Sequence, residues 1–222
     1  MDESKTIYEA VNGPVLAAVP LSARRILDIG CGTGALGERL LDRQPCEVVG
    51  ITYSEQEAKI ASRRLAKVVC ADLNNVDFSS LDNFDCAILS HILEHLYRPD
   101  EVLERLKRAL HPQSVIVVAL PNVLFWKQRR EFLMGRWRYE DGGIMDRTHF
   151  RFFDYWSAGK LLGEAGYEIV ATTKDGAFPL TRAGRKLMGP AALSIDRFAC
   201  NRWPGLFACQ FVYLAKLRNG NQ

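Results

Sequence analysis

Three glycines at alternate positions follow a short apolar run near the start of the chain, in the segment 26–34, which reads ILDIGCGTG. Alternate glycines permit a tight turn, and the backbone can approach a ligand closely because no Cβ stands in the way. Leucines at helical spacing follow at once, and the first turn of a helix offers unpaired N–H groups. The segment therefore predicts a strand, a ligand-binding turn and a helix in succession.

Apolar runs alternate with amphipathic segments through residue 121. This alternation is typical of βαβ units, and right-handed crossovers then give a doubly wound α/β fold with a mostly parallel sheet. Ligands of such sheets bind beyond the carboxyl ends of the strands. We expect strands at 25–29, 47–51, 67–70, 84–89, 114–120, 167–173 and 207–216, and helices at 35–42, 55–65, 99–110, 124–134 and 155–165.

Two stretches interrupt this order. Residues 122–153 are rich in aromatic residues and arginine, and residues 176–205 are rich in proline, glycine and arginine. A length of 222 residues suits one generous domain. We therefore predict a single domain over 1–222, in which 122–153 is an insertion and 176–205 is a cap segment with one helix, both on the ligand side.

Composition limits where such a chain can work. The apolar runs fall short of the roughly 18 residues that a membrane span needs, and the first residues, MDESK, show no apolar leader. The six cysteines, at 31, 46, 70, 86, 200 and 209, form no CxxC pair and no cluster with histidine. We expect a reduced cytoplasmic protein without a disulfide framework or a metal site.

The glycine turn fits two kinds of ligand. The pattern Gly32-x-Gly34-x-x-Gly37 formally matches a dinucleotide site. Such a site typically also has an acidic residue at the end of the second strand, but this chain has Thr52 there. Asp28 places a carboxylate within the first strand. A carboxylate favours binding of a cationic ligand beside it and disfavours binding of a pyrophosphate. These residues favour a ligand with ammonium and sulfonium centres over a nicotinamide dinucleotide.

The run Asp28-x-Gly30-x-Gly32-x-Gly34 resembles the first motif of class I S-adenosylmethionine-dependent methyltransferases. Further resemblances follow at 70–73, at 84–95 and at 110–113, and the likeness covers about 25–175 together with an antiparallel last strand at 207–216. It implies a seven-stranded Rossmann-like sheet and S-adenosylmethionine as methyl donor, with S-adenosylhomocysteine as product. The donor-binding residues that it implies are Asp28, Gly30, Cys31, Gly32, Gly34, Asp72 beside the adenine amine, Leu73 against the adenine ring, and Ser90.

The second strand departs from this family, because most members end it with an acid that holds the ribose. Here the chain reads Gly50-Ile51-Thr52-Tyr53-Ser54. A similar turn occurs in relatives that include the cyclopropane-forming fatty acid enzymes, which use a residue of the next helix. By that analogy Glu57, or less favourably Glu55, holds the ribose, while Thr52 and Tyr53 line the adenosine pocket. The alternatives are that Glu57 only completes a capping box with Ser54, or that the chain is a non-catalytic partner of another enzyme.

A hydroxyl acceptor needs a general base, and histidine suits neutral pH. His91 directly follows the fourth strand, and His95 lies one helical turn later in a Leu-Glu-His run that is common in small-molecule methyltransferases. His111 precedes the fifth strand, on the side away from the ligands, and we expect it to be inert. His91 and His95 are therefore candidate catalytic residues.

The segment 142–153 resembles one found in bacterial methyltransferases of sugar, O-antigen and cell-surface glycan pathways. If this segment is catalytic, His149 is the base, Asp146 orients it and Arg151 contacts an anion or a hydroxyl. The alternative is a hydrogen-bonded brace of Asp146, Thr148, His149 and Arg151, because buried polar groups demand such partners. The resemblance favours a hydroxyl of a sugar, glycan precursor or related metabolite as acceptor; a nitrogen or carbon of a lipid or quinone is the alternative.

Charge is uneven along the chain. Residues 1–121 hold 13 Lys and Arg against 17 Asp and Glu, whereas residues 122–222 hold 16 against 9. Cations interleave with aromatic residues at Lys127, Arg129, Arg130, Arg136 and Arg138. This pattern suits a phosphate-bearing acceptor such as a nucleotide sugar or a lipid-linked glycan. We expect no nucleic acid partner, because a separate binding module is missing and the net charge is only +3. The segment 193–214 either touches a membrane surface or, the interpretation we favour, packs within the protein.

Overall fold

A computed structural model describes residues 11–81 and 83–218. The strands are β1 (Arg25–Ile29), β2 (Glu47–Thr52), β3 (Lys67–Cys70), β4 (Phe84–Ser90), β5 (Leu110–Pro121), β6 (Tyr167–Gly176) and β7 (Ala208–Leu217). The α-helices are α1 (Gly13–Ala18), α2 (Ala35–Arg43), α3 (Glu55–Ala61), α4 (Pro99–Leu106), α5 (Trp126–Leu133), α6 (Tyr155–Glu164), α7 (Arg182–Met188), α8 (Ala191–Arg202) and α9 (Pro204–Phe207). Short 3-10 helices are η1 (Phe78–Ser80), η2 (Leu93–His95) and η3 (Lys107–Ala109).

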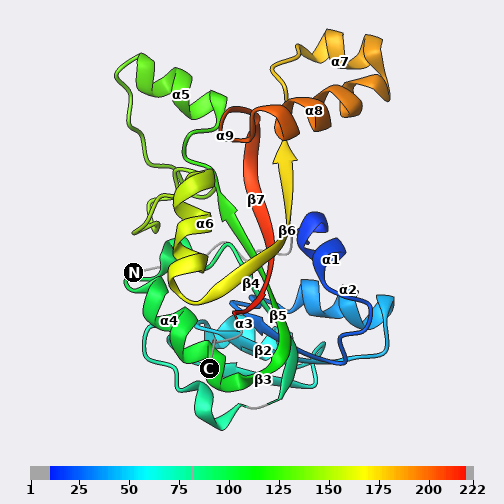
Figure 1. Cartoon of the computed structure of the whole chain (residues 1–222), viewed down its shortest axis with the longest axis vertical. Coiled ribbons are helices and arrows are strands. Elements are labelled where there is room, and N and C mark those ends of the chain that lie inside the picture. Colours follow the sequence, from blue (N-terminus) through cyan, green and yellow to red (C-terminus); the bar gives the residue numbers. More distant parts are fainter. Residues whose placement is uncertain (1–10, 82, 219–222) are drawn as a thin grey trace.

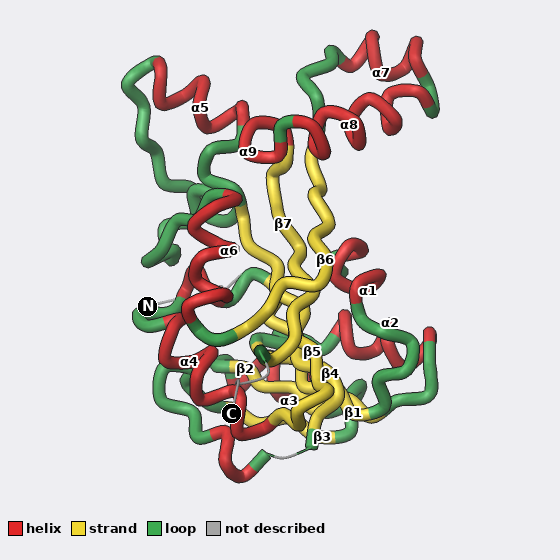
Figure 2. Tube along the Cα trace, viewed as in Figure 1, coloured by secondary structure: helices red, strands yellow, loops and turns green. Residues whose placement is uncertain are grey.

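The strands form one seven-stranded sheet in the order β3-β2-β1-β4-β5-β7-β6 (Figures 1 and 2). The pairs among β1 to β5 are parallel, and β7 runs antiparallel to both of its neighbours. The chain order reverses between β1 and β4, which is the place where an open α/β sheet binds its ligands. The predicted doubly wound sheet with an antiparallel last strand is confirmed.

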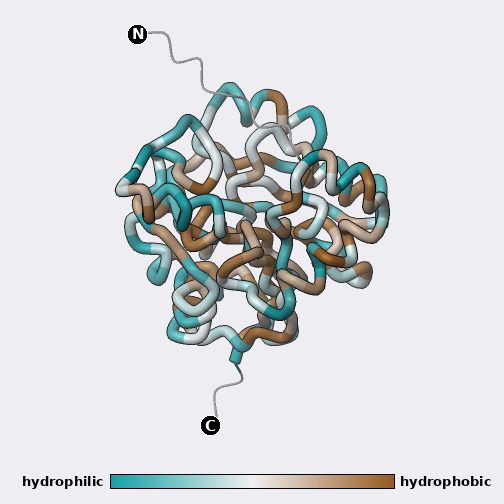
Figure 3. The backbone as a smooth tube through the Cα atoms, turned by 90° about the horizontal axis from the view of Figure 1, so that it is seen from above, coloured by the Kyte–Doolittle hydropathy of each residue, from teal (hydrophilic) through white to brown (hydrophobic). Residues whose placement is uncertain are grey.

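Two apolar clusters cover the two faces of the sheet, because neighbouring residues of a strand point to opposite faces. On β4, Ala87 and Leu89 belong to the cluster that includes residues of α4 and α6, whereas Cys86 and Ile88 belong to the cluster that includes residues of α1, α2 and α3. Hydrophobic stretches accordingly cross the middle of the molecule (Figure 3). A fold buried on both faces explains why the central strands are almost continuously apolar.

The helix after β2 begins at Glu55 as predicted, but it ends earlier and its capping differs. Ser54 caps it as expected, since its side chain accepts from the backbone N–H of Glu57. The Glu57 carboxylate does not complete the capping box; it accepts a hydrogen bond from Thr52 instead. The helix ends at Ala61 rather than at residue 65, and Leu65 turns into the core. The capping-box interpretation of Glu57 is therefore wrong.

The stretch between β6 and β7 holds α7, α8 and α9 where the sequence predicted one helix. Asp196 of α8 pairs with Arg185 of α7 and accepts from the backbone N–H of Phe178. These contacts hold α7 and α8 together as one arm. Figure 1 shows this arm and α5 beyond the same end of the sheet, where β5 and β6 end.

The first ten residues, for which we expected no leader, lie outside the described residues. In the described part of the chain, no helix is both long and apolar enough to cross a membrane.

Candidate functional site

The glycine turn after β1 has the backbone that only glycine adopts without strain. Gly30, Gly32 and Gly34 have φ of 77°, 53° and 81°. The N–H groups of Gly30 and Cys31 donate to the carbonyl oxygen of Ile51, at 2.8 and 2.9 Å, so the turn is fastened to β2. A Cβ at Gly30 would lie 2.0 Å from Cδ1 of Ile92. The turn therefore brings a bare backbone to the carboxyl edge of the sheet.

Asp28 lies directly before this turn and is almost fully buried, with 2 % of its surface exposed. Its Oδ2 has no hydrogen-bond partner among the described residues. Burial raises the pKa of Asp28 to about 7, because the ionised form is poorly solvated in the interior. An unpartnered buried carboxylate costs free energy that a cationic ligand would offset. Asp28 is therefore suited to pair with a cationic ligand beside the glycine turn.

The end of β2 brings Thr52 and Glu57 together. The hydroxyl of Thr52 donates to Oε2 of Glu57 at 2.9 Å. Thr52 is buried, whereas Tyr53 is 69 % exposed. A carboxylate thus stands next to the end of β2 although the strand itself ends in threonine.

Two donor-binding predictions concern residues whose side chains are engaged elsewhere. The side chain of Cys31 is buried against Gly50, where a glycine Cβ would meet its sulfur at 2.5 Å, and its backbone N–H and carbonyl oxygen bond to Ile51 and Gly34. Leu73 is likewise buried in the core. The sequence did not reveal Arg64, whose guanidinium donates to the carbonyl and hydroxyl oxygens of Thr33 within the glycine turn.

Asp72 stands after β3, as the resemblance required. Its carboxylate accepts from the backbone N–H of Asn74 and from the side-chain amides of Asn74 and Asn75. The backbone hydrogen bond from Asn74 is the largest cause that holds the pKa of Asp72 below its ordinary value. Asp72 is therefore an ionised acceptor at the same edge of the sheet as Asp28.

Ser90 ends β4, and His91 follows with a positive φ of 56°. Nδ1 of His91 lies 3.2 Å from Oε1 of Glu94, and its Nε2 lies 3.0 Å from Oε1 of Gln210 on β7. Burial lowers the pKa of His91, but the hydrogen bond and charge of Glu94, with the bond from Gln210, outweigh it and leave the pKa raised. The arrangement is a histidine oriented by a buried carboxylate.

Residues far apart in the sequence complete the surroundings of His91. Asn12 donates to Oε1 of Gln210 at 2.8 Å and lies 3.3 Å from Nε2 of His91. Gln210 also donates to Asp175 on β6. No local pattern marks Asn12 or Gln210, because only the sheet order brings the chain before α1 beside β7.

The insertion places the other candidate residues in one cluster with His95. Asp146 accepts from both the backbone N–H and the hydroxyl of Thr148, at 2.7 and 2.6 Å. Nδ1 of His149 lies 3.2 Å from the carbonyl oxygen of Ile144. Among the described contacts Asp146 therefore orients Thr148 and not His149. Burial is the largest cause that holds the pKa of His149 below its ordinary value.

Backbone contacts fasten this cluster to the turn after β4. The N–H groups of Phe150 and Arg151 donate to the carbonyl oxygen of Glu94, and the guanidinium of Arg151 donates to the carbonyl oxygen of Tyr97. The rings of His95 and His149 meet edge to face at 4.6 Å. The contacts expected of a brace are thus present, and they surround two histidines. His111 lies within β5 and not before it, because β5 begins at Leu110. It pairs with Asp85 at the edge of the sheet away from the candidate site, and this location is the expected one.

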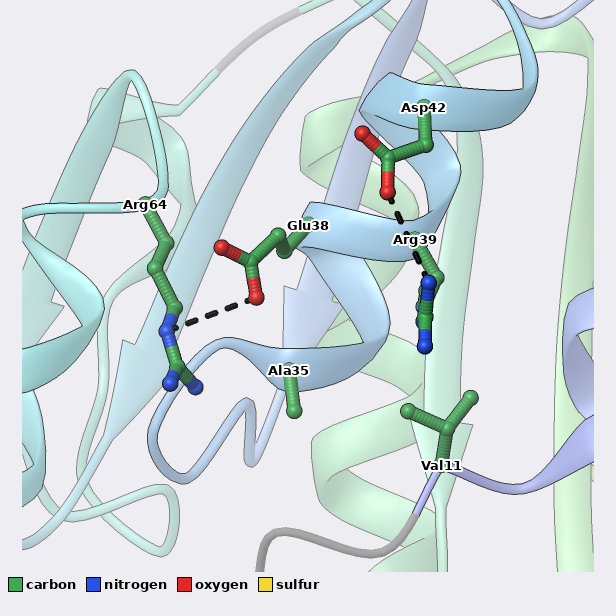
Figure 4. A pocket seen from close by; sticks show the side chains of 6 residues that line it. All are labelled: Val11, Ala35, Glu38, Arg39, Asp42 and Arg64. Carbon is green, nitrogen blue, oxygen red and sulfur yellow. Dashed lines mark ion pairs between the residues drawn. The ribbon is translucent and has the colours of Figure 1, made fainter.

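A separate pocket lies on the outer side of α2. It is lined by Val11, Ala35, Glu38, Arg39, Asp42 and Arg64 (Figure 4). Its charged groups pair with each other, Arg64 with Glu38 and Arg39 with Asp42. None of its charges is left over for a ligand, so the carboxyl edge of the sheet remains the candidate site.

A family model described as a methyltransferase domain matches residues 9–172. Among curated relatives, a demethylmenaquinone methyltransferase of Clavibacter sepedonicus is 33 % identical over 107 residues, which are 46 % of this chain and 43 % of that protein. A ubiquinone biosynthesis O-methyltransferase of Idiomarina loihiensis is 28 % identical over 108 residues, 46 % of this chain and 44 % of that protein. The chain spans less than half the length of these two relatives.

Solved structures share the fold at low identity. A SAM-dependent methyltransferase from Archaeoglobus fulgidus gives a TM-score of 0.61 at 22 % identity and covers 88 % of this chain and 86 % of its own. A 1,6-didemethyltoxoflavin-N1-methyltransferase from Burkholderia thailandensis, solved with S-adenosylhomocysteine, gives 0.59 at 18 % identity, with coverage of 93 % and 78 %. The sheet is therefore that of S-adenosylmethionine-dependent methyltransferases.

Proposed function

The chain belongs to the methyltransferase domain family, and from this premise we propose that it transfers a methyl group from S-adenosylmethionine to a hydroxyl oxygen of a small-molecule acceptor. The observation that carries the proposal is Asp28, a buried carboxylate without a partner for Oδ2 beside three glycines of positive φ. A cationic donor on this turn gives that charge the partner it lacks. The product S-adenosylhomocysteine keeps the ammonium group and loses the sulfonium charge.

Two further carboxylates support a position for the donor along the carboxyl edge. Glu57, held by Thr52, has the two oxygens that accept hydrogen bonds from both ribose hydroxyls. Asp72 offers an ionised acceptor to an adenine amine. The backbone of Gly30 to Gly34 would pass beneath the methionine part, while exposed Tyr53 covers the adenosine. Leu73 would contribute through its backbone, whereas Cys31 holds the shape of the turn through its bonds to Ile51 and Gly34.

His91 is the base that we propose for the acceptor. Its neutral ring donates from Nδ1 to Glu94 and has a lone pair on Nε2, which faces the side-chain amide of Asn12 at 3.3 Å. Oε1 of Gln210, 3.0 Å from Nε2, only accepts, so it stabilises the proton that Nε2 takes up. As the acceptor oxygen bonds to the methyl carbon, the carbon–sulfur bond breaks, sulfur keeps the electron pair, and the hydroxyl proton goes to Nε2. Alignment of donor and acceptor supplies the larger share of the rate.

The nature of the acceptor is inferred from two segments beyond the end of the sheet, the part of the insertion that carries α5 and the segment that carries α7, α8 and α9, which we call the two arms. Residues 122–139 and 176–207 each carry five Lys and Arg against one acidic residue. They also expose Leu133, Trp137, Leu187, Leu193 and Phe198. We propose that the insertion 122–153 and the cap 176–205 cover the acceptor, and that the acceptor joins an anionic group to an apolar chain, as a lipid-linked glycan does.

A second acceptor class has its own support. The demethylmenaquinone and ubiquinone enzymes among the relatives act, by their names, in quinone biosynthesis. A prenylated phenol also offers a hydroxyl and an apolar chain, and it lacks the anionic group. The charge surplus of the arms favours the lipid-linked glycan, and the names of the relatives favour the phenol.

We further propose that the protein acts in the reducing environment of the cytoplasm. All six cysteines are free, and three of them are buried, which suits a compartment that keeps thiols reduced.

Acceptor-dependent formation of S-adenosylhomocysteine tests the proposal. Purified protein is incubated with S-adenosylmethionine and either a polyprenyl diphosphate-linked sugar or a prenylated catechol, and the product is identified by mass spectrometry. We expect an O-methylated product from one of these classes. His91→Gln should lower kcat by about 10²- to 10⁴-fold and leave donor affinity unchanged, whereas His111→Gln should match the wild type. Product formation by His91→Gln at the wild-type rate would contradict the role of His91, and no product from either class would contradict the acceptor proposal.

A further inference from the structure

Glu94, His95 and His149 form a group of which the proposed methyl transfer uses only Oε1 of Glu94, the partner of His91. One ring nitrogen of each histidine and one carboxylate oxygen of Glu94 lie within 4.8 Å of one another. Glu94 and His95 come from η2, which begins three residues after the end of β4, and His149 comes from the insertion. We propose that these three side chains bind a divalent transition-metal ion of the Zn²⁺ class.

The hydrogen bonds around the two imidazoles are those of metal ligands. Nδ1 of His95 lies 3.0 Å from the hydroxyl and 3.3 Å from the carbonyl oxygen of Thr148. Nδ1 of His149 lies 3.2 Å from the carbonyl oxygen of Ile144. A carbonyl oxygen accepts only, so it keeps the proton on Nδ1 and leaves Nε2 with its lone pair, as the outer partners of metal-bound histidines do. Within the described residues neither Nε2 has a hydrogen-bond partner.

Glu94 supplies an independent observation. Its side chain is 0 % exposed, Oε1 contacts His91, and Oε2 has no hydrogen-bond partner among the described residues. A buried carboxylate oxygen without a partner is costly. A brace made of Asp146, Thr148 and His95 accounts for Nδ1 of His95, but it leaves this oxygen without a partner. A cation between Glu94 and the histidines gives it one.

The ligand types select the metal. Two imidazoles suit zinc, copper, iron and nickel, whereas magnesium and calcium prefer oxygen ligands. Three protein ligands leave a fourth position open, which is the arrangement of zinc sites that bind a further oxygen. Because the group lies beside the carboxyl end of β4, that position is open to an acceptor hydroxyl or carboxylate. Only this use of the metal rests on the proposed function; the binding of the ion does not.

Metal titration of the full chain, first freed of metal with a chelator, tests the site. We expect one Zn²⁺ per chain by calorimetry, and Co²⁺ should give visible absorption bands of a site with nitrogen ligands. His149→Gln, His95→Gln and Glu94→Gln should each weaken Zn²⁺ binding at least about tenfold, the least that loss of even an outer partner costs. His111→Gln, a histidine change at the opposite edge of the sheet, should bind as the wild type does.

Several results would overturn the site: wild type that binds no Zn²⁺, three variants that bind as tightly as wild type, or a His111→Gln variant that is weakened equally. Thermal unfolding of each variant without metal shows whether the variant is folded. If the group is only a structural brace, the variants should have a lower Tm, and Zn²⁺ should not raise the Tm of wild type. Calorimetry needs neither donor nor acceptor. Failure of Zn²⁺ binding with intact methyl transfer therefore overturns only the metal site, and the reverse result overturns only the proposed function.

Discussion

At the scale of single residues, Asp28 sets the balance between stability and ligand binding. Its folded-state pKa of about 7 lies above the ordinary value of 3.8, so the folded state binds this proton more tightly than the unfolded state does. Stability is therefore lost as pH rises from 3.8 towards 7, and the loss is complete above 7. The buried position that suits a cationic ligand thus destabilises the protein when no ligand is bound.

Replacing this carboxylate tests that balance. At about pH 8, Asp28→Asn should be more stable than wild type by a few kcal/mol, since each unit of pKa shift corresponds to about 1.4 kcal/mol. The difference should vanish near pH 4, where wild type is protonated as well. Urea unfolding of both proteins across this range measures it. An Asp28→Asn variant that is less stable at high pH would contradict the assigned role of burial.

Glu57 gives a second residue-scale prediction. If its carboxylate holds the ribose, Glu57→Gln should weaken S-adenosylmethionine binding by about 10- to 100-fold, the range for hydrogen bonds to a charged group. Glu55→Gln, two residues earlier on α3 and exposed, should leave the affinity unchanged. Calorimetric titration compares the two variants. Equal affinities would assign the ribose to another residue.

Sequence patterns revealed some of these residues and not others. Asp28 and the glycines lie in one short motif, and Glu57 follows from the helix that Ser54 caps. Glu94 was seen only as part of a common Leu-Glu-His run, because burial and a missing partner for Oε2 are properties of the packed molecule. The predicted pairing of Asp146 with His149 instead became a pairing with Thr148, because the tight turn brings the adjacent N–H closer.

At the scale of elements, the turn between β1 and α2 depends on Gly30. Alanine there would combine a positive φ with a Cβ 2.0 Å from Ile92. Gly30→Ala should therefore cost about 2 kcal/mol or more of unfolding free energy. Gly205→Ala is the control, because nothing lies within 4 Å of a Cβ at that position. Equal unfolding free energies for the two variants, measured in urea, would contradict the strain.

Periodicity predicted the strands well, because strands buried on both faces read as continuous apolar runs. The arm of α7, α8 and α9 was harder to predict, since α7 buries no residue and α8 buries only four. A helix with so little buried surface shows a weak apolar stripe. The packing of α7 against α8 depends on the ion pair between Arg185 and Asp196, which no helical spacing reveals.

At the scale of the whole molecule, the chain brings remote segments to one edge of the sheet. His91 follows β4, Asn12 precedes α1 and Gln210 lies on β7, yet their side chains meet. These contacts follow from the strand order β4-β5-β7, and the sequence alone gave no register for β7. The surroundings of the proposed base could therefore be known only from the fold.

The two arms give a prediction at this scale. Leu133 and Leu187 are each 90 % exposed, so the double change to serine should leave Tm unchanged. If the arms cover an acceptor with an apolar chain, the same change should raise KM for that acceptor several-fold and leave kcat close to wild type, since it removes binding shared by ground and transition states. Steady-state kinetics with a short-chain acceptor is the control. An unchanged KM for the long-chain acceptor would show that these leucines serve another surface.

The most direct test of the account is calorimetric titration with S-adenosylmethionine and S-adenosylhomocysteine of wild type, Asp28→Asn and a surface control, Asp100→Asn. We predict micromolar binding to wild type at about pH 8, a fall in affinity of about tenfold per pH unit well below 7 as Asp28 becomes protonated, and loss of binding in Asp28→Asn alone. Absence of binding at millimolar donor, or an Asp28→Asn variant that binds like wild type at every pH, would contradict the claim that this turn holds a methyl donor.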